Sequence, residues 1–149
     1  MVTDKQKLYS VSELAKEFLL TPQALRFYEE KGLLSPQRAG TARVFDYRDR
    51  ARLILILKFR RLGFSLEEIK EYLSHYRPDE PNAQQYRDGI EKIRRRIKAL
   101  QTMRVEIDET LAELKAMEKD ARARLKEAEM SEAETSNKMS RQTDEVPRG

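Results

Sequence analysis

The sequence predicts a mainly α-helical chain in which a small helical domain with a β-hairpin is followed by one long helix. Helix-capping signals recur at short intervals through the first half of the 149 residues. A turn signal centred on Gly40 interrupts them. From residue 82 to about residue 127 there is no proline, and apolar residues alternate at spacings of three and four. We therefore expect a domain over residues 8–77, a dimerisation helix over 82–127 and a disordered tail over 128–149.

The first two helices are predicted from their N-terminal caps. Ser10 and Glu13 fit a capping box in front of apolar residues at helical spacing. Thr21 and Pro22 fit an N-cap followed by a proline at the first helical position, and Gly32 ends this second helix. Because only a short connection separates the two helices, they predict a helix-turn-helix.

The next segment predicts a hairpin and two further helices. The hairpin turns at Gly40, and Asp46 can cap a third helix that ends near Leu62. The apolar run over 53–57 is also compatible with a buried strand, but the absence of helix breakers and the flanking arginines and lysines favour a helix. A capping box at Ser65 begins the fourth helix.

The long helix predicts a coiled coil between two copies of the chain. With Ile90 at position a, nine of the eleven a and d positions are apolar. The residues predicted to form the seam are Ile93, Ile97, Leu100, Ile107, Leu111 and Leu114. In a parallel dimer the charged a residues Arg104 and Glu118 would each face their own copy inside an apolar seam. An antiparallel homodimer centred near Glu109 places them against leucines instead, so we expect that arrangement.

Composition and charge exclude several classes of function. The chain has no cysteine and one histidine, so we expect no metal, no cofactor and no enzymatic activity. No apolar run could span a bilayer and no signal peptide is visible, so we expect a cytoplasmic protein without a membrane partner. Residues 38–61 contain eight basic residues against two aspartates, a patch typical of polyanion binding.

The second helix and the hairpin carry side chains suited to DNA. Arginine and glutamine can bond base edges, while tyrosine and lysine can bind phosphates. The candidate residues are Gln23, Arg26, Phe27, Tyr28 and Lys31 on the helix and Arg38 and Arg43 on the hairpin. Arg43, just after the turn, would project from the hairpin tip into a groove or onto a phosphate. The alternative to DNA contact is that the helix residues are ordinary exposed side chains of a small helical bundle. For Arg43, the alternative is an ordinary exposed arginine at a strand edge.

These motifs resemble the MerR family of bacterial transcription regulators. The matching stretches are Tyr9–Ala15, Thr21–Leu34, Arg43–Phe45 and Leu62–Ile69. The resemblance implies a winged helix-turn-helix domain and an antiparallel coiled-coil homodimer. It implies binding to a palindromic promoter element in double-stranded DNA, which is bent and untwisted so that RNA polymerase can use it. It also implies DNA contacts by Thr21, Gln23, Arg26, Tyr28 and Arg43, with Tyr9 or Ser10 at a phosphate.

The sequence departs from two well-known branches of that family. It lacks the cysteines with which the metal sensors hold their ion, and only a tail follows the long helix where the drug sensors carry a binding domain. We therefore expect any effector to be a small organic molecule. The stretches Asp49–Leu53 and Arg60–Ser65 most resemble the subgroup that controls breakdown of branched-chain amino acids and acyl-CoA. His75 lies near tyrosines at the joint between domain and long helix, where either an effector or simple aromatic packing is compatible with the sequence.

Two other classes of function remain open from the residues alone. In a structural or adaptor protein, the long helix would be the functional part and the first domain would bind another protein. An enzyme would need a nucleophile and a base, and no such pair is visible in the sequence. The basic patch beside a helix-turn-helix favours the DNA-binding regulator over both.

Overall fold

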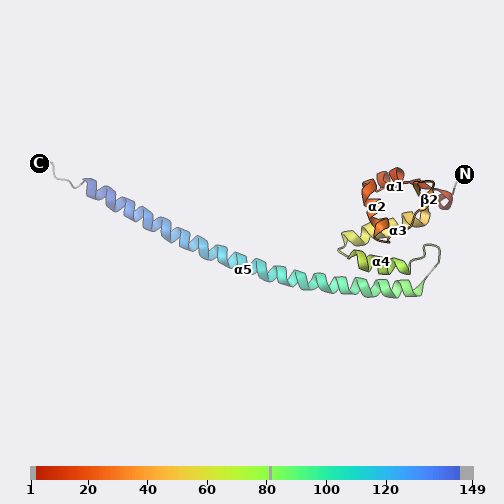
Figure 1. The fold of residues 1–149 in the computed structure, drawn as a ribbon. Helices are drawn as coiled ribbons and strands as arrows, with labels where there is room; N and C mark the ends of the chain where they lie inside the picture. Colours follow the sequence, from red (N-terminus) through yellow and green to blue (C-terminus); the bar gives the residue numbers. More distant parts are fainter. Residues whose placement is uncertain (1–2, 81, 145–149) are drawn as a thin grey trace. The chain divides into compact units, whose positions relative to one another are not determined.

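The computed structural model describes residues 3–80 and 82–144, and the chain divides into two compact units between Lys98 and Ala99 (Figure 1). The helices are η1 (Asp4–Gln6, a 3-10 turn), α1 (Val11–Glu17), α2 (Pro22–Glu30), α3 (Tyr47–Arg61), α4 (Leu66–Ser74) and α5 (Ala83–Asp144). The strands are β1 (Tyr9–Ser10), β2 (Gln37–Ala39) and β3 (Ala42–Phe45). The predicted mainly helical fold with a β-hairpin and a long last helix is confirmed.

The predicted caps begin the four short α-helices. The side chains of Ser10 and Thr21 accept hydrogen bonds from backbone N–H groups three residues on, at 3.1 and 3.2 Å. Asp46 and Ser65 form complete capping boxes at the starts of α3 and α4. Each cap satisfies N–H groups that have no partner inside the helix, so the caps fix where each helix starts. Residues 53–57 lie inside α3, which excludes the buried strand.

The three strands form one antiparallel sheet in the order β1-β3-β2. Gly40 has a φ of 65° at the hairpin turn, a backbone conformation that glycine adopts without strain. The register places Arg38 beside Arg43 and joins Tyr9 to Phe45. Strand β1 was not predicted, because a strand of two residues is too short to show the alternating pattern.

The core of the first unit lies between the sheet and helices α1 to α4. Its side chains with less than 2% exposure are Leu14, Leu25, Leu33, Leu34, Phe45, Leu53, Ile56, Ile69 and Leu73. Arg52 of α3 connects two segments that flank this core. Its Nε donates to the Leu33 carbonyl at 3.1 Å, and its Nη1 donates to the Leu73 carbonyl at 3.2 Å. The segment after α2 and the end of α4 are thereby held against the same helix.

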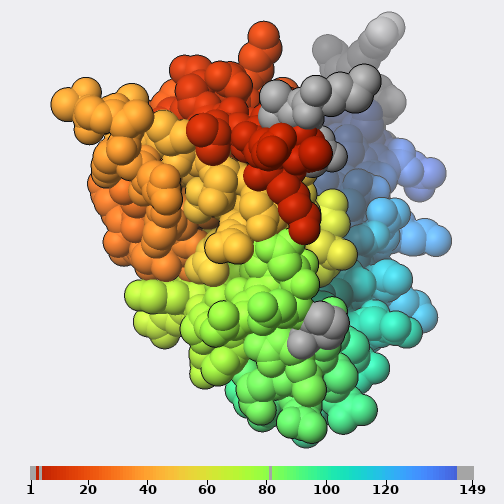
Figure 2. All heavy atoms as spheres, turned by 90° about the vertical axis from the view of Figure 1, so that its right-hand side faces the viewer, coloured from red at the N-terminus to blue at the C-terminus, as the bar shows by residue number. Residues whose placement is uncertain are grey.

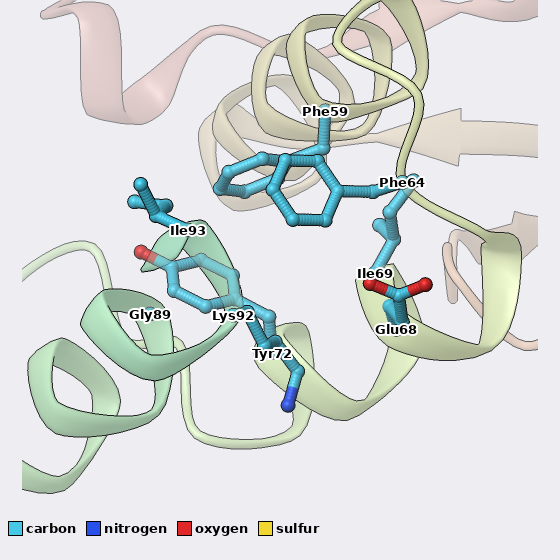
Figure 3. A pocket seen from close by; sticks show the side chains of 8 residues that line it. All are labelled: Phe59, Phe64, Glu68, Ile69, Tyr72, Gly89, Lys92 and Ile93. Carbon is cyan, nitrogen blue, oxygen red and sulfur yellow. The ribbon is translucent and has the colours of Figure 1, made fainter. Parts of the chain in front are cut away.

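The first turns of α5 belong to the first unit and pack against α4 (Figures 1 and 2). Figure 3 shows the apolar pocket at this joint, with aromatic rings from α3, α4 and the loop between them facing α5. A Cβ placed on Gly89 would lie 2.9 Å from Cε2 of Tyr72, so the absence of a side chain there permits the close approach. Gln85, 5% exposed, donates to the Tyr72 hydroxyl at 3.1 Å, and Arg96 donates to the Leu62 carbonyl at 2.9 Å.

Helix α5 continues well past the predicted end near residue 127. The expected disorder is wrong over 128–144, which are helical, while 145–149 lie outside the described residues. The physical reason is that continuing an existing helix needs no new nucleus, and no proline or glycine follows Gly89 before Asp144. The missing apolar periodicity indicates exposure instead, and side chains 101–143 are all exposed. No helix in 3–80 or 82–144 is both long and apolar enough to cross a membrane.

Leu19, in the turn between α1 and α2, has a left-handed backbone and an almost completely exposed side chain. Its φ is 55° and its exposure is 93%. This conformation costs a residue with a Cβ about 1 kcal/mol, and the side chain recovers little by packing. We expect Leu19→Gly to raise the free energy of unfolding by about 1 kcal/mol, less the entropy that glycine adds to the unfolded chain.

Urea denaturation followed by circular dichroism measures this effect. Leu20→Gly serves as the control, because Leu20 packs against the core and its loss should lower stability. A Leu19→Gly variant less stable than the natural chain would contradict the interpretation of Leu19 as a strained residue.

Candidate nucleic-acid interface

Helix α2 presents one polar face to solvent and buries the other. Leu25 and Tyr28 lie in the core, whereas Gln23 and Arg26 are exposed. Residues three apart are neighbours on a helix surface, so Gln23 and Arg26 form a pair near the start of α2. Within the described residues neither side chain has a hydrogen bond or ion pair. Both are therefore exposed and available, and their contact with base edges stays a prediction.

The tyrosines predicted to contact DNA are mostly buried. Tyr28 is 7% and Tyr9 is 8% exposed, and both belong to the core. In the described part of the chain, no fully buried side-chain polar atom lacks a partner, and neither hydroxyl has one. Both hydroxyl oxygens therefore keep some contact with solvent, although most of each tyrosine is buried. The ring of Tyr28 packs below α2 in the core, and the contact of its hydroxyl with a phosphate stays a prediction.

The hairpin is attached to α2 through Glu29. Arg38 of β2 donates to one carboxylate oxygen of Glu29 at 2.7 Å, and Arg43 of β3 donates to the other. The side chains of Glu29 and Arg43 are only 20% and 23% exposed. Arg43 therefore does not project from the hairpin tip as predicted, since its side chain turns toward α2. The hairpin and the helix are thereby fixed relative to each other.

Glu29 was missed by the sequence analysis. A glutamate near the end of a helix that contacts DNA normally suggests a solvated side chain, because it repels phosphate. The two partners of Glu29 can be identified only when the hairpin register is known, because this register sets Arg38 opposite Arg43. The spacing of the two arginines around the Gly40 turn was the one signal in the sequence that could have indicated a shared acceptor.

The remaining predicted residues take part in helix caps and in one cation–π contact. Ser10 and Thr21 are used as N-caps of α1 and α2. Phe27 is 39% exposed, and the Lys31 ammonium lies 5.6 Å from the centre of its ring, within reach of a cation–π contact. Lys31 is thereby held close to the exposed face of α2.

Much of the predicted basic patch is neutralised inside the chain. Besides Arg38 and Arg43, Arg50 binds Glu17 and lowers the pKa of that carboxyl, mainly through their hydrogen bond. Arg48 lies 3.7 Å from Asp79. The net charge of the segment therefore overstates its pull on a polyanion. In the described residues, the patch members without an ion pair at the end of α3 are Lys58, Arg60 and Arg61.

One carboxyl of α3 has a perturbed pKa. Asp49 is 8% exposed, and burial raises its pKa to about 6 despite the backbone N–H of Asp46 that it accepts. The same burial lowers the pKa of the neighbouring Arg52. Both groups act in the structure, Asp49 in the cap of α3 and Arg52 between carbonyl groups, so neither belongs to the exposed face of α2.

The residues predicted for dimerisation form an uncovered apolar stripe along α5. Their side chains are between 43% and 58% exposed, namely Ile93, Ile97, Leu100, Ile107, Leu111 and Leu114. Near the start of α5, His75 lies 3.3 Å from Asp88, and Tyr72 is part of the aromatic packing at the joint. In 3–80 and 82–144 no three His, Asp or Glu side chains gather in a group that could hold a metal ion.

A helix-turn-helix with an attached hairpin and two available polar side chains at the start of the second helix defines a winged DNA-binding protein. The model of the MerR HTH family regulatory proteins matches residues 9–76, and the MerR DNA-binding model matches 50–117. The HTH-type transcriptional regulator CueR of Escherichia coli O157:H7 is 37% identical over 101 residues, covering 64% of this chain and 75% of CueR. ZntR of Escherichia coli K12 is 32% identical over 114 residues, covering 75% and 74%.

Solved structures share the fold. A MerR family regulator from Bacillus cereus superposes with a TM-score of 0.59 at 24% identity, covering 76% of this chain and 82% of that one. HiNmlR, a MerR family regulator lacking the sensor domain and solved bound to promoter DNA, gives a TM-score of 0.55 at 22% identity, covering 78% and 94%. The chain belongs to the MerR family and is a DNA-binding transcriptional regulator. The relatives named above do not support the predicted subgroup for branched-chain amino acid and acyl-CoA breakdown.

The ion pairs of Glu29 predict a specific loss of stability. Glu29→Ala removes the shared acceptor of two partly buried arginines, so we expect the free energy of unfolding to fall by about 1 kcal/mol. The adjacent Glu30→Ala is the matched control, because Glu30 is exposed and has no partner in the described residues. Urea denaturation of both variants checks this, and equal losses would contradict a fastening role for Glu29.

Proposed function

We propose that this regulator binds a palindromic promoter element as an antiparallel homodimer and bends and untwists the DNA. The observation that carries the proposal is the exposed pair Gln23 and Arg26, without partners in the described residues and close to the N-terminus of α2. In helix-turn-helix proteins the N-terminal residues of the second helix reach base edges in the major groove. The pair is suited to that task, because arginine reads guanine and glutamine reads adenine bidentately.

The other predicted residues support docking on the backbone. The hydroxyl oxygens of Tyr28 and Tyr9 keep some contact with solvent, so a phosphate oxygen can accept from them. The hairpin, held by Glu29, brings Arg38 and Arg43 beside α2, so both can exchange part of their bonding to Glu29 for a phosphate. Membership of the MerR family and the shared fold with HiNmlR support this assignment of roles.

The uncovered stripe on α5 supports the homodimer. Six aliphatic side chains about half exposed on one helix face lose hydrophobic stabilisation unless a second apolar face covers them. An antiparallel pair keeps Arg104 and Glu118 away from their own copies, and it gives each protomer's DNA-binding unit its own half-site. Distortion of the element between the half-sites would then present the promoter to RNA polymerase.

We further propose that any effector is a small organic molecule. Thiolates are the ligands preferred by soft metal ions, and this sequence contains no cysteine. The one histidine, His75, is already adjacent to Asp88 and has no third ligand nearby within the described residues. These features support an effector held by packing and hydrogen bonds instead of by metal coordination.

If α2 contacts bases and the hairpin contacts phosphates, substitutions in the two elements should cause different DNA-binding defects. Arg26→Ala should relax discrimination at one base pair of each half-site, costing about 1–3 kcal/mol there. Arg43→Ala should weaken binding evenly across sequences. For the natural chain, three or four phosphates neutralised by each protomer give a slope of log K against log salt of roughly −5 to −7.

Fluorescence anisotropy on operator fragments with single base changes, at several salt concentrations, separates these effects. If both variants lose affinity in the same sequence-independent way, the assignment of base readout to α2 fails. A slope of log K against log salt near zero for the natural chain would contradict the proposed DNA binding.

The antiparallel dimer is tested by disulfide trapping, since the chain has no natural cysteine. In a pair centred near Glu109, Thr110 lies beside the seam close to its own copy, so Thr110→Cys should crosslink to itself. Leu100→Cys and Leu114→Cys should not self-crosslink, because their copies lie far apart along an antiparallel pair. Self-crosslinking at all three positions, resolved on a non-reducing gel, would show parallel helices.

A further inference from the structure

The start of α3, the end of α4 and the loop that follows α4 form a pocket of about 370 Å³, within the size range of small-molecule sites. Three arginines line this pocket, namely Arg48, Arg52 and Arg77, and Tyr76 and Pro78 add apolar surface. No residue of α2 or of the hairpin lines it, so it is separate from the surface proposed to contact DNA. It is called the arginine pocket below.

The guanidinium of Arg52 is partly buried and held in one orientation. Its Nε and Nη1 donate to the backbone carbonyls of Leu33 and Leu73, and it forms no ion pair within the described residues. Its Nη2 has no hydrogen-bond partner there, and since no fully buried side-chain nitrogen lacks a partner, Nη2 is accessible. Burial lowers the pKa of this guanidinium, so a negative charge bound beside it would stabilise its charged form.

Arg48 lies beside a carboxylate to which it is only loosely paired. Its Nε donates to the Tyr47 hydroxyl at 3.2 Å and is 3.7 Å from Oδ2 of Asp79, beyond hydrogen-bond distance. Asp79 instead accepts from the Tyr47 hydroxyl at 2.5 Å and pairs with Lys5 at 3.2 Å. The two terminal nitrogens of Arg48 have no hydrogen bond within the described residues, so they can still donate to a second carboxylate.

We propose that the arginine pocket binds a small organic carboxylate, whose oxygens accept from Arg48 and Arg52 and whose apolar part packs against Tyr76 and Pro78. Arg48 and Arg52 are four residues apart on α3 and are therefore neighbours on its surface. This inference deepens the small organic effector proposed above, and it rests on that proposal only for the role of the ligand.

The lining favours a carboxylate over a phosphate. Asp79 and Glu80 belong to the same pocket, so a doubly charged anion would be repelled more strongly than a singly charged one. The position of Asp79 next to Arg48 also shows that a carboxylate is accommodated there. The apolar surface of Tyr76 and Pro78 would be left uncovered by an inorganic ion, which favours an organic ligand.

Isothermal titration calorimetry of the full chain without DNA tests the class of ligand. Hexanoate and benzoate are the probes, and hexanamide and benzamide are their uncharged counterparts. We expect at least one of the two carboxylates to bind with a dissociation constant of about 1 mM or lower, and its amide to bind at least about tenfold more weakly. Equal binding of acid and amide, no binding of either acid, or tighter binding of inorganic phosphate would overturn the proposal.

Substitutions around the pocket test its residues. Arg48→Gln should raise the dissociation constant of the carboxylate about tenfold, and Asp79→Asn should lower it about threefold because a competing negative charge is removed. Arg60→Gln is the matched control, since Arg60 is an exposed arginine of the same helix, outside the pocket and without an ion pair in the described residues. Equal weakening by Arg48→Gln and Arg60→Gln would show unspecific attraction to a basic chain and refute the site.

Nuclear magnetic resonance locates the bound carboxylate directly. In TROSY spectra of the full chain, the largest shift changes on titration should fall on the backbone amides of residues 73–80 and of the first turn of α3. Changes centred on α2 or the hairpin would place the ligand elsewhere and refute the arginine pocket. Spectra of each variant without ligand verify that the fold is kept, which the exposed side chain of Arg48 permits.

The binding site and the regulator function can fail separately, because the ligand is titrated without DNA. If the variants behave as expected but the saturating carboxylate leaves the operator affinity of the natural chain unchanged, the binding site stands and its effector role is refuted. If the natural chain shows no salt-dependent DNA binding, the proposed function fails whatever calorimetry shows.

Discussion

The shared acceptor Glu29 joins α2 and the hairpin, which together form the proposed DNA-binding face, into one surface. The hairpin has few apolar residues of its own, and a two-stranded ribbon in water is marginal without a partner element. Its strands gain a third neighbour in β1, and Arg38 and Arg43 add a charged connection to α2. Because α2 is also held from beneath by Leu25 and the Tyr28 ring, the pair Gln23 and Arg26 keeps a fixed spacing from the hairpin. Such preorganisation lowers the ordering entropy that binding to DNA would otherwise cost.

The sequence predicted those parts of the fold that depend on local chemistry. Caps such as Asp46 and Ser65 act within a few residues, so their positions could be located without any tertiary information. Burial of the Tyr28 ring and the pairing of Glu29 depend on which elements meet in space, and a single sequence does not show that. The end of α5 was misjudged because absence of apolar periodicity was interpreted as disorder, although in a helix already formed it indicates solvation.

Counting charges along the chain also failed to show which side chains meet in space. A run of arginines over 38–61 suggested one polyanion-binding patch, yet several of these side chains bind carboxylates or backbone carbonyls of the same unit. Arg52 illustrates the difference, since its guanidinium donates to two carbonyls and is partly buried. The positive charge that is not paired inside the chain is therefore concentrated on fewer residues, and a local net charge measures attraction only after internal pairs are removed.

The contact between Gly89 and Tyr72 has a geometrical consequence for α5. The helix presents one position without a Cβ to the tyrosine ring, and the residues on either side of it in sequence carry side chains. Turning the helix about its own axis would bring a substituted carbon against the ring and displace α4. The rotation of the first turns of α5 about the helix axis is therefore fixed relative to α4.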